Sequence, residues 1–149
     1  RLRRRSAASL HSPRRAPLLR SRTVTARALL TQLNAGRMAL GAGLIARPEL
    51  VTGQWLGKDG RRPAVKVLAR AFGARDAVLG AGTLDALRNG RPLRPWVLAG
   101  IVADATDLLA THFGRHHLPR PSAPLIYALA GGALLVGAAN VEDSPAPQA

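Results

Sequence analysis

The sequence predicts an all-α integral membrane four-helix bundle, and three observations lead to it. Residues 121–141 are 21 residues without a charged side chain, about the length that crosses a bilayer. Residues 64–87 and 95–113 are also apolar and rich in Gly and Ala, yet each carries charges near its middle. Aromatic residues are only 3 % of the chain, which suits close helix packing in lipid better than a soluble core that depends on aromatic side chains.

The first helix is expected at residues 26–46. It should end there because Arg47 precedes Pro48, and the residue before a proline disfavours helix. Arg37 then lies near the helix middle. If the helix instead begins at Arg37, that side chain lies at the interface; we favour the buried placement. Residues 50–57 contain Trp55 and predict an interfacial segment, since Trp is enriched at that depth.

Three polar connectors separate the remaining helices, predicted at 64–87, 95–113 and 121–141. The third helix begins at Pro95, where the missing N–H of proline costs nothing. The last connector contains His116 and His117, which together with His112 suggest a metal site. Adjacent side chains converge poorly on one ion and no acidic or Cys ligand is near in sequence, so we expect a solvated loop and no metal.

The third predicted helix places charges on one face. Gly100, Asp104 and Asp107 are spaced i, i+4, i+7, and residues at this spacing lie on the same side of a helix. A charged side chain at mid-membrane costs roughly 2.5–3.5 kcal/mol on insertion scales. We therefore expect these carboxylates to point into the bundle and to pair with basic side chains.

The second predicted helix offers the partners. Gly73, Asp76 and Gly80 are spaced i, i+3, i+7, and glycines on two facing helices allow close approach. Arg70 and Arg75 flank this face, and we expect them to reach a neighbouring carboxylate. The whole predicted charge network is Arg37, Arg70, Arg75, Asp76, Asp104 and Asp107. The predicted close-packing residues are Gly41, Gly73, Gly80 and Gly100. Three positive and three negative charges cancel.

The basic residues and the lack of cysteine limit the function. The chain has no Cys, which excludes disulfides and thiolate sites. Its mean hydropathy of +0.03 is low for a membrane protein, because the arginines of the N-terminal tail and the connectors lower the average. The net charge of +14 suggests nucleic-acid binding, but the arginines are concentrated in residues 1–24 and in short connectors, so no nucleic-acid partner is expected.

The predicted domains are a disordered Arg-rich tail at 1–24, a transmembrane domain at 25–141 and a disordered acidic tail at 142–149.

The tail has three interpretations: a cytoplasmic segment on anionic lipid headgroups, a transit-peptide-like segment, or an upstream extension, as the chain does not begin with Met. The tail and the connector at 88–94 hold most flanking arginines. The positive-inside rule therefore predicts a multi-pass protein of the inner (plasma) membrane with both termini in the cytoplasm.

Three groups of residues carry a resemblance: Arg37 with Ala39-Leu40-Gly41, then the run Arg70-Ala71-Phe72-Gly73-Ala74-Arg75-Asp76-Ala77-Val78-Leu79-Gly80, then Trp96, Ala99-Gly100, Ala103-Asp104 and Asp107. Together they resemble small four-span membrane proteins of unknown function in high-GC actinobacteria. The resemblance covers about residues 30–140. It implies a bacterial inner-membrane protein and no assigned activity. The Arg-rich head lies outside the family pattern.

No catalytic motif or cofactor site is found, so we do not expect an enzyme. A membrane alcohol phosphotransferase would need a further Asp four residues after Asp104, whereas Asp107 follows after three. The expected function is a structural or accessory membrane subunit, as a homo-oligomer or in a larger complex. The alternatives are a path for protons, ions or a small polar ligand, an ordinary soluble bundle, and, more distantly, a basic nucleic-acid binder.

Overall fold

The computed structural model describes the backbone of residues 16–141 and the side chains of residues 25–141. This part is helical apart from short connectors and contains no strand, so the predicted all-α class is confirmed. Residues 16–141 form five helices: α1 (Ala16–Ala46), α2 (Pro48–Leu56), α3 (Pro63–Asn89), α4 (Arg94–Gly114) and α5 (Ser122–Val141). Short 3-10 turns lie at Gly57–Arg61 and Arg115–His117.

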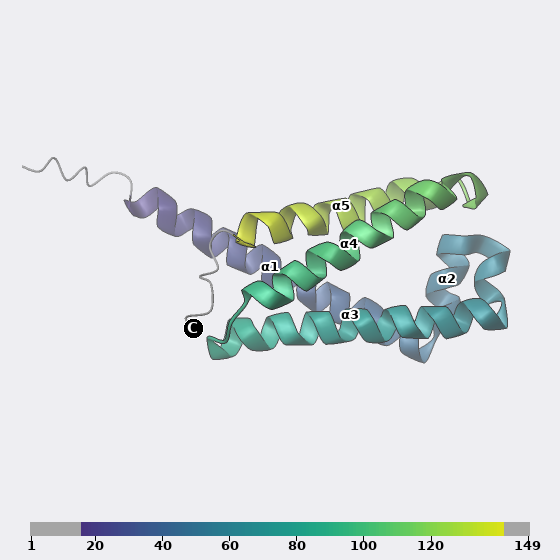
Figure 1. Ribbon diagram of the computed structural model, residues 1–149, viewed down its shortest axis with the longest axis horizontal. Coiled ribbons are helices and arrows are strands. Elements are labelled where there is room, and N and C mark those ends of the chain that lie inside the picture. Colours follow the sequence, from purple (N-terminus) through teal and green to yellow (C-terminus); the bar gives the residue numbers. More distant parts are fainter. Residues whose placement is uncertain (1–15, 142–149) are drawn as a thin grey trace, which may run out of the picture.

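The four long helices form two antiparallel pairs (Figure 1). α1 packs mainly along α3, and α4 packs mainly along α5. α4 crosses α3 obliquely: the two helices meet near their short connector and separate toward the other end, where α2 lies. The described ends of α1 and α5 lie at the same end of the bundle as the α3–α4 connector.

The predicted helix boundaries agree with α3, α4 and α5 to within a few residues. α1 differs, because it begins at Ala16 rather than near residue 26. The backbone of residues 16–24 is therefore helical, which corrects the expectation of a disordered tail over that stretch. Residues 1–15 and 142–149, the other parts of the predicted tails, lie outside the described residues. The predicted interfacial segment is the short helix α2, so the domain has one helix more than expected.

Glycines bring α1 and α3 into close contact. A Cβ on Gly41 would lie 2.5 Å from the Gly73 carbonyl oxygen, and one on Gly80 would lie 2.7 Å from the Asn34 carbonyl oxygen. Real Cβ atoms do not approach backbone atoms this closely, so these positions need glycine. The prediction had Gly73 and Gly80 facing α4. This is wrong, because in the structure they face α1.

Large side chains of α4 pack on glycines of α3 and α5. The ring of Trp96, at the start of α4, occupies the space that a side chain on Gly82 of α3 would take. Ile101 of α4 packs on Gly137 of α5. The α4 helix is thus held from both sides in its first half.

α2 and the following turn close one end of the bundle. The Thr52 hydroxyl is buried and lies 2.8 Å from the Pro48 carbonyl oxygen and 2.6 Å from the Gly60 carbonyl oxygen. The buried Ser122 hydroxyl, at the start of α5, donates to the Trp55 carbonyl oxygen. These bonds fix α2 between the two helical pairs at that end.

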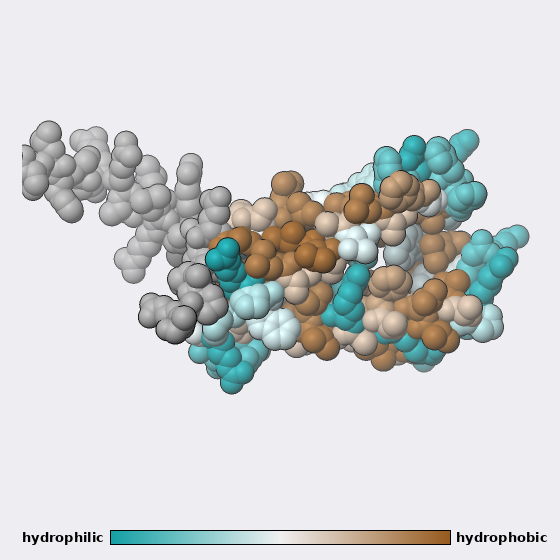
Figure 2. Space-filling view, in the orientation of Figure 1, coloured by the Kyte–Doolittle hydropathy of each residue, from teal (hydrophilic) through white to brown (hydrophobic). Residues whose placement is uncertain are grey.

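The outer surface of the bundle is mostly apolar. Figure 2 shows apolar residues over much of one face, interrupted near its middle by a small hydrophilic patch, and further hydrophilic residues at its two ends. Exposed side chains include Val102 at 65 %, Leu135 at 70 % and Phe113 at 79 %. A soluble protein of this size rarely leaves so much contiguous apolar surface open.

Two described stretches are long and apolar enough to cross a membrane, Arg94–His117 and Ser122–Val141. In the apolar window of each, only 22 % of the residues are buried inside the protein. A core helix of a soluble protein would be mostly buried. The other two long helices, α1 and α3, do not meet the same standard of length and hydropathy.

Candidate functional site

A buried ion pair joins α1 to α4 at the middle of the bundle. The Arg37 Nη2 atom lies 2.5 Å from both carboxylate oxygens of Asp104. The two side chains are 8 % and 10 % exposed. α1 does not begin at Arg37, as one alternative supposed: Arg37 lies in the interior of the helix and its side chain is buried. Asp104 stands halfway along Arg94–Gly114.

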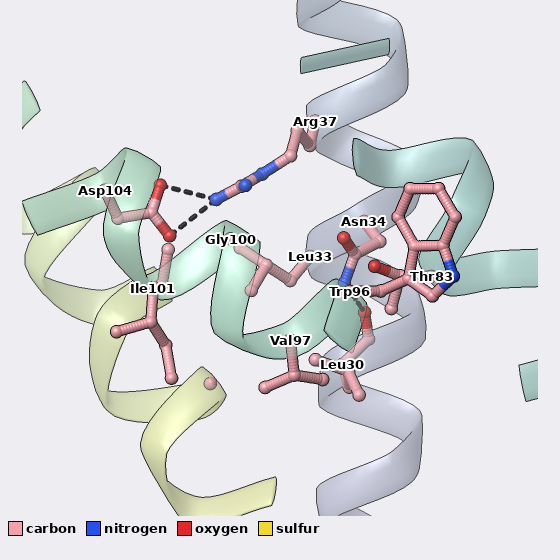
Figure 3. Close-up of a pocket in the computed structure, with 12 residues that line it drawn as sticks. Leu30, Leu33, Asn34, Arg37, Thr83, Trp96, Val97, Gly100, Ile101 and Asp104 are labelled. Atoms are coloured by element: carbon pink, nitrogen blue, oxygen red, sulfur yellow. Dashed lines mark hydrogen bonds and ion pairs between the residues drawn. The ribbon is translucent and has the colours of Figure 1, made fainter. Parts of the chain in front are cut away.

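Gly100 makes room for this pair. It lies one turn before Asp104 on α4, and a Cβ there would be 3.3 Å from the Arg37 Nη1 atom. Figure 3 shows the Arg37 side chain leaving α1, passing Gly100 and reaching Asp104. The i, i+4 spacing seen in the sequence therefore serves the guanidinium group of α1, rather than a close approach to α3.

A second charged group joins α3 to α4. Arg75 donates to both carboxylate oxygens of Asp107, at 3.0 and 2.8 Å, in the two-pronged geometry typical of guanidinium–carboxylate pairs. Its Nε and Nη2 atoms also donate to one oxygen of Asp76, at 3.1 and 3.0 Å. The Phe72 ring lies 5.1 Å from the guanidinium carbon, within cation–π range. We call Arg75, Asp76 and Asp107 the Arg75 cluster.

Arg70 stands apart from these groups. It is exposed, and its Nε atom donates to the Ile45 carbonyl oxygen at 3.2 Å. It forms no ion pair within the described residues. Its predicted place in the charge network is therefore corrected: it lies on a different side of α3 from Asp76 and does not reach α4.

Both groups connect the two helical pairs. The basic members lie on α1 and α3, and α4 contributes one acidic member to each group. Asp107 is three residues after Asp104, nearly one helical turn, so the same face of α4 meets both arginines. Few other contacts link α3 to α4, because the two helices diverge. The long arginine side chain spans that separation.

A small cavity adjoins the first pair. Its volume is about 20 Å³, enough for about one water molecule. Arg37 and Asp104 line it together with Asn34 of α1 and Thr83 of α3, and Trp96 and Gly100 of α4 complete one wall (Figure 3). The Asn34 amide donates to the Leu30 carbonyl oxygen and the Thr83 hydroxyl to the Leu79 carbonyl oxygen. Both polar groups are thus partly satisfied by their own helices.

Asn34 and Thr83 were missed in the sequence. The signal was present for Asn34, because it lies three residues before Arg37 and seven before Gly41 on one face of α1. Thr83 follows Gly80 at the same three-residue spacing on α3. Both are buried polar residues on helix faces that also carry the charges and glycines of the predicted network.

The three described histidines, His112, His116 and His117, do not belong to a metal-binding group. Among the described residues, no three His, Cys, Asp or Glu side chains lie close enough to hold an ion. His112 Nδ1 lies 3.4 Å from the Tyr127 hydroxyl, and its Nε2 lies 3.0 Å from Arg115. Asp104 and Asp107 each have an arginine partner instead of sharing a cation.

Comparison with known proteins adds no identity. No protein-family model, curated protein or solved structure matches the chain. The resemblance to four-span actinobacterial proteins therefore stays a prediction.

Proposed function

We propose that this chain is a small integral membrane protein, a structural or accessory subunit, in which Arg–Asp pairs fasten two helical pairs together inside the bilayer. The observation that carries the proposal is the Arg37–Asp104 pair, buried at mid-bundle under an outer surface that is apolar. Lipid cannot hydrate an arginine or an aspartate, so each needs a partner inside the protein. In water such a pair would add little, because desolvation offsets most of the attraction.

The proposal includes four membrane spans. α4 and α5 support it by length and composition. The positions of Arg37 and Arg75, away from the helix ends, support it for α1 and α3, because each arginine is paired with an aspartate of α4. The lower hydropathy of these two helices comes partly from those same charges. Both described ends then lie on one side, which the positive-inside rule makes the cytoplasm, with the tail arginines near anionic lipid.

A substitution on α5 tests whether lipid surrounds the bundle. Leu129 is 58 % exposed and close to the middle of Ser122–Val141. In water, Leu129→Arg would be neutral, because the side chain would simply be hydrated. In a bilayer we expect it to reduce insertion by about 3 kcal/mol. The readout is the fraction of full chain that stays in membranes after high-salt and alkaline washes and leaves them only in detergent.

Leu50→Arg is the matched control. Leu50 is 60 % exposed but lies on α2 at the end of the bundle, where an arginine can reach headgroups. We expect normal membrane retention for this variant. Release of the unmodified chain by high salt alone would contradict the proposal and favour a basic soluble protein held by its charge.

A second candidate function is a path or pocket for protons or a small polar ligand. The cavity beside Arg37 and Asp104, with Asn34 and Thr83 in its lining, favours it. Asp104→Asn separates the two functions, because it keeps the shape and removes the charge. Normal yield with altered proton flux into liposomes would favour the path, whereas loss of folded protein would support the structural role.

A further inference from the structure

The charges inside the bundle do not balance locally. Arg37 and Asp104 sum to zero. The Arg75 cluster has one positive and two negative members, so its net charge is −1. Arg70 carries the missing +1 but lies away from the cluster. The six charges of one chain sum to zero, but Arg70 and the Arg75 cluster lie too far apart to compensate each other.

Arg70 lies beside apolar positions of α3 that face outward. Val67, one turn before it, is 66 % exposed, and Ala74, one turn after it, is also exposed. The Arg75 cluster is also open to the outside: the Arg75 and Asp107 side chains are 29 % and 26 % exposed. Each uncompensated charge is therefore accessible to a molecule that docks on α3.

The exposed face of α3 lies between the two. It consists of Val67, Ala71, Ala74 and Val78, and it points away from the face that contacts α1. At 100° per residue, Arg70 lies on one flank of this face and Arg75 on the other. Val and Ala side chains are short and allow a second helix to approach.

We propose that this face of α3 is the interface of a parallel two-fold dimer of the chain, in which Arg70 of each copy pairs with the Arg75 cluster of the other. This inference depends on the proposed membrane location. A two-fold axis parallel to α3 brings the left flank of one helix opposite the right flank of its mate, as with e and g positions in parallel coiled coils. Both charge imbalances then disappear at once.

The heights of the groups agree with this arrangement. Arg70 precedes the middle of α3, and Asp107 follows the middle of α4. The two helices run in opposite directions, so both residues are displaced toward the end of the bundle that holds α2 (Figure 1). Arg70 is five residues from Arg75, about 7.5 Å along the helix axis, a separation that an extended arginine and a modest helix crossing can span.

The test uses two full-length copies with different tags, expressed together and extracted from membranes in a mild detergent. We expect each unmodified copy to capture the other. Arg70→Gln should lower capture more than tenfold, and Arg70→Lys should retain most of it because it keeps the charge. Arg120→Gln, an exposed arginine in the last connector, should leave capture unchanged.

A crosslink provides a second readout that does not depend on variants of Arg70. The chain has no cysteine, so Ala74→Cys introduces a single thiol at the proposed interface. We expect it to form a disulfide between copies in the membrane, whereas Leu135→Cys on the exposed face of α5 should not. A membrane-bound chain that neither captures a second copy nor crosslinks at residue 74 overturns the dimer and leaves the proposed function intact. Capture that persists in Arg70→Gln also overturns it. A chain absent from membranes overturns both proposals.

Discussion

Removing one partner of the Arg37–Asp104 pair tests the structural role most sharply. Asp104→Leu leaves the Arg37 guanidinium buried without a counter-charge, since Arg37 has no other acidic partner within the described residues. Breaking a buried pair in this way costs about 3–5 kcal/mol, similar to the roughly 2.5–3.5 kcal/mol for a lone charge at mid-membrane. A loss of about 3 kcal/mol changes the unfolding equilibrium constant by more than about a hundredfold.

The double variant Arg37→Met with Asp104→Leu is the control. Replacing both charges by apolar side chains of similar length removes the burial cost together with the attraction, so we expect stability within about 1 kcal/mol of the unmodified protein. The assay is reversible unfolding in mixed micelles with increasing SDS, followed by helical circular dichroism and Trp fluorescence. Trp96 lines the same cavity and reports locally. If Asp104→Leu changes stability by less than about 0.5 kcal/mol, or if the double variant is worse than either single one, the pair does not act as a lock.

Three further predictions use the same unfolding assay. Gly41→Ala should lower the free energy of unfolding by about 1–3 kcal/mol, because its Cβ would meet backbone atoms of α3. The control Gly131→Ala should be neutral or stabilising, because its Cβ meets nothing within 4 Å. Equal effects of the two substitutions would contradict close packing of α1 on α3. Arg75→Lys should destabilise the protein by about 1–2 kcal/mol, because Lys cannot make the two-pronged bond to Asp107. An unchanged midpoint of SDS unfolding would show that this bond does not contribute to stability. Thr52→Val should lower the free energy of unfolding by about 1–2 kcal/mol, because it leaves the Gly60 carbonyl oxygen unpaired. Thr106→Val should change it little, because the Thr106 hydroxyl bonds only to its own helix. A larger effect of Thr106→Val would contradict a stabilising role of the Thr52 hydroxyl in α2.

The contact between Arg75 and a carboxylate of α4 was predictable and is confirmed by its bonds to Asp107, but the partners of Asp104 and Arg70 were not. The spacing of Gly100, Asp104 and Asp107 indicates a shared face on any helix. It does not say which helix faces it. The structure pairs Asp104 with Arg37 of α1, and α3 turns its glycines toward α1 instead of α4. Pairing across helices depends on how the hairpins dock, and docking is decided by shape over the whole surface.

The end of α1 and the helix α2 show a second limit. Residues 16–24 are basic and contain Pro17, a composition that favoured a disordered tail. The structure continues α1 through them, and Pro17 lies in the first turn, where it removes no helical hydrogen bond. The α2 cap depends on Thr52 and Ser122 bonding to carbonyl oxygens of other segments, and such long-range contacts leave no periodic signal in the sequence.

The account depends on lipid surrounding the middle of the bundle, and a spin label at Val102 measures this directly. Val102 is 65 % exposed and lies two residues before Asp104, and Val102→Cys would be the only thiol in the chain. In liposomes, the account predicts that molecular oxygen relaxes the label strongly and that a water-soluble nickel complex does not reach it. A label reached by the nickel complex as readily as one at Arg120 would place this surface in water and contradict the account.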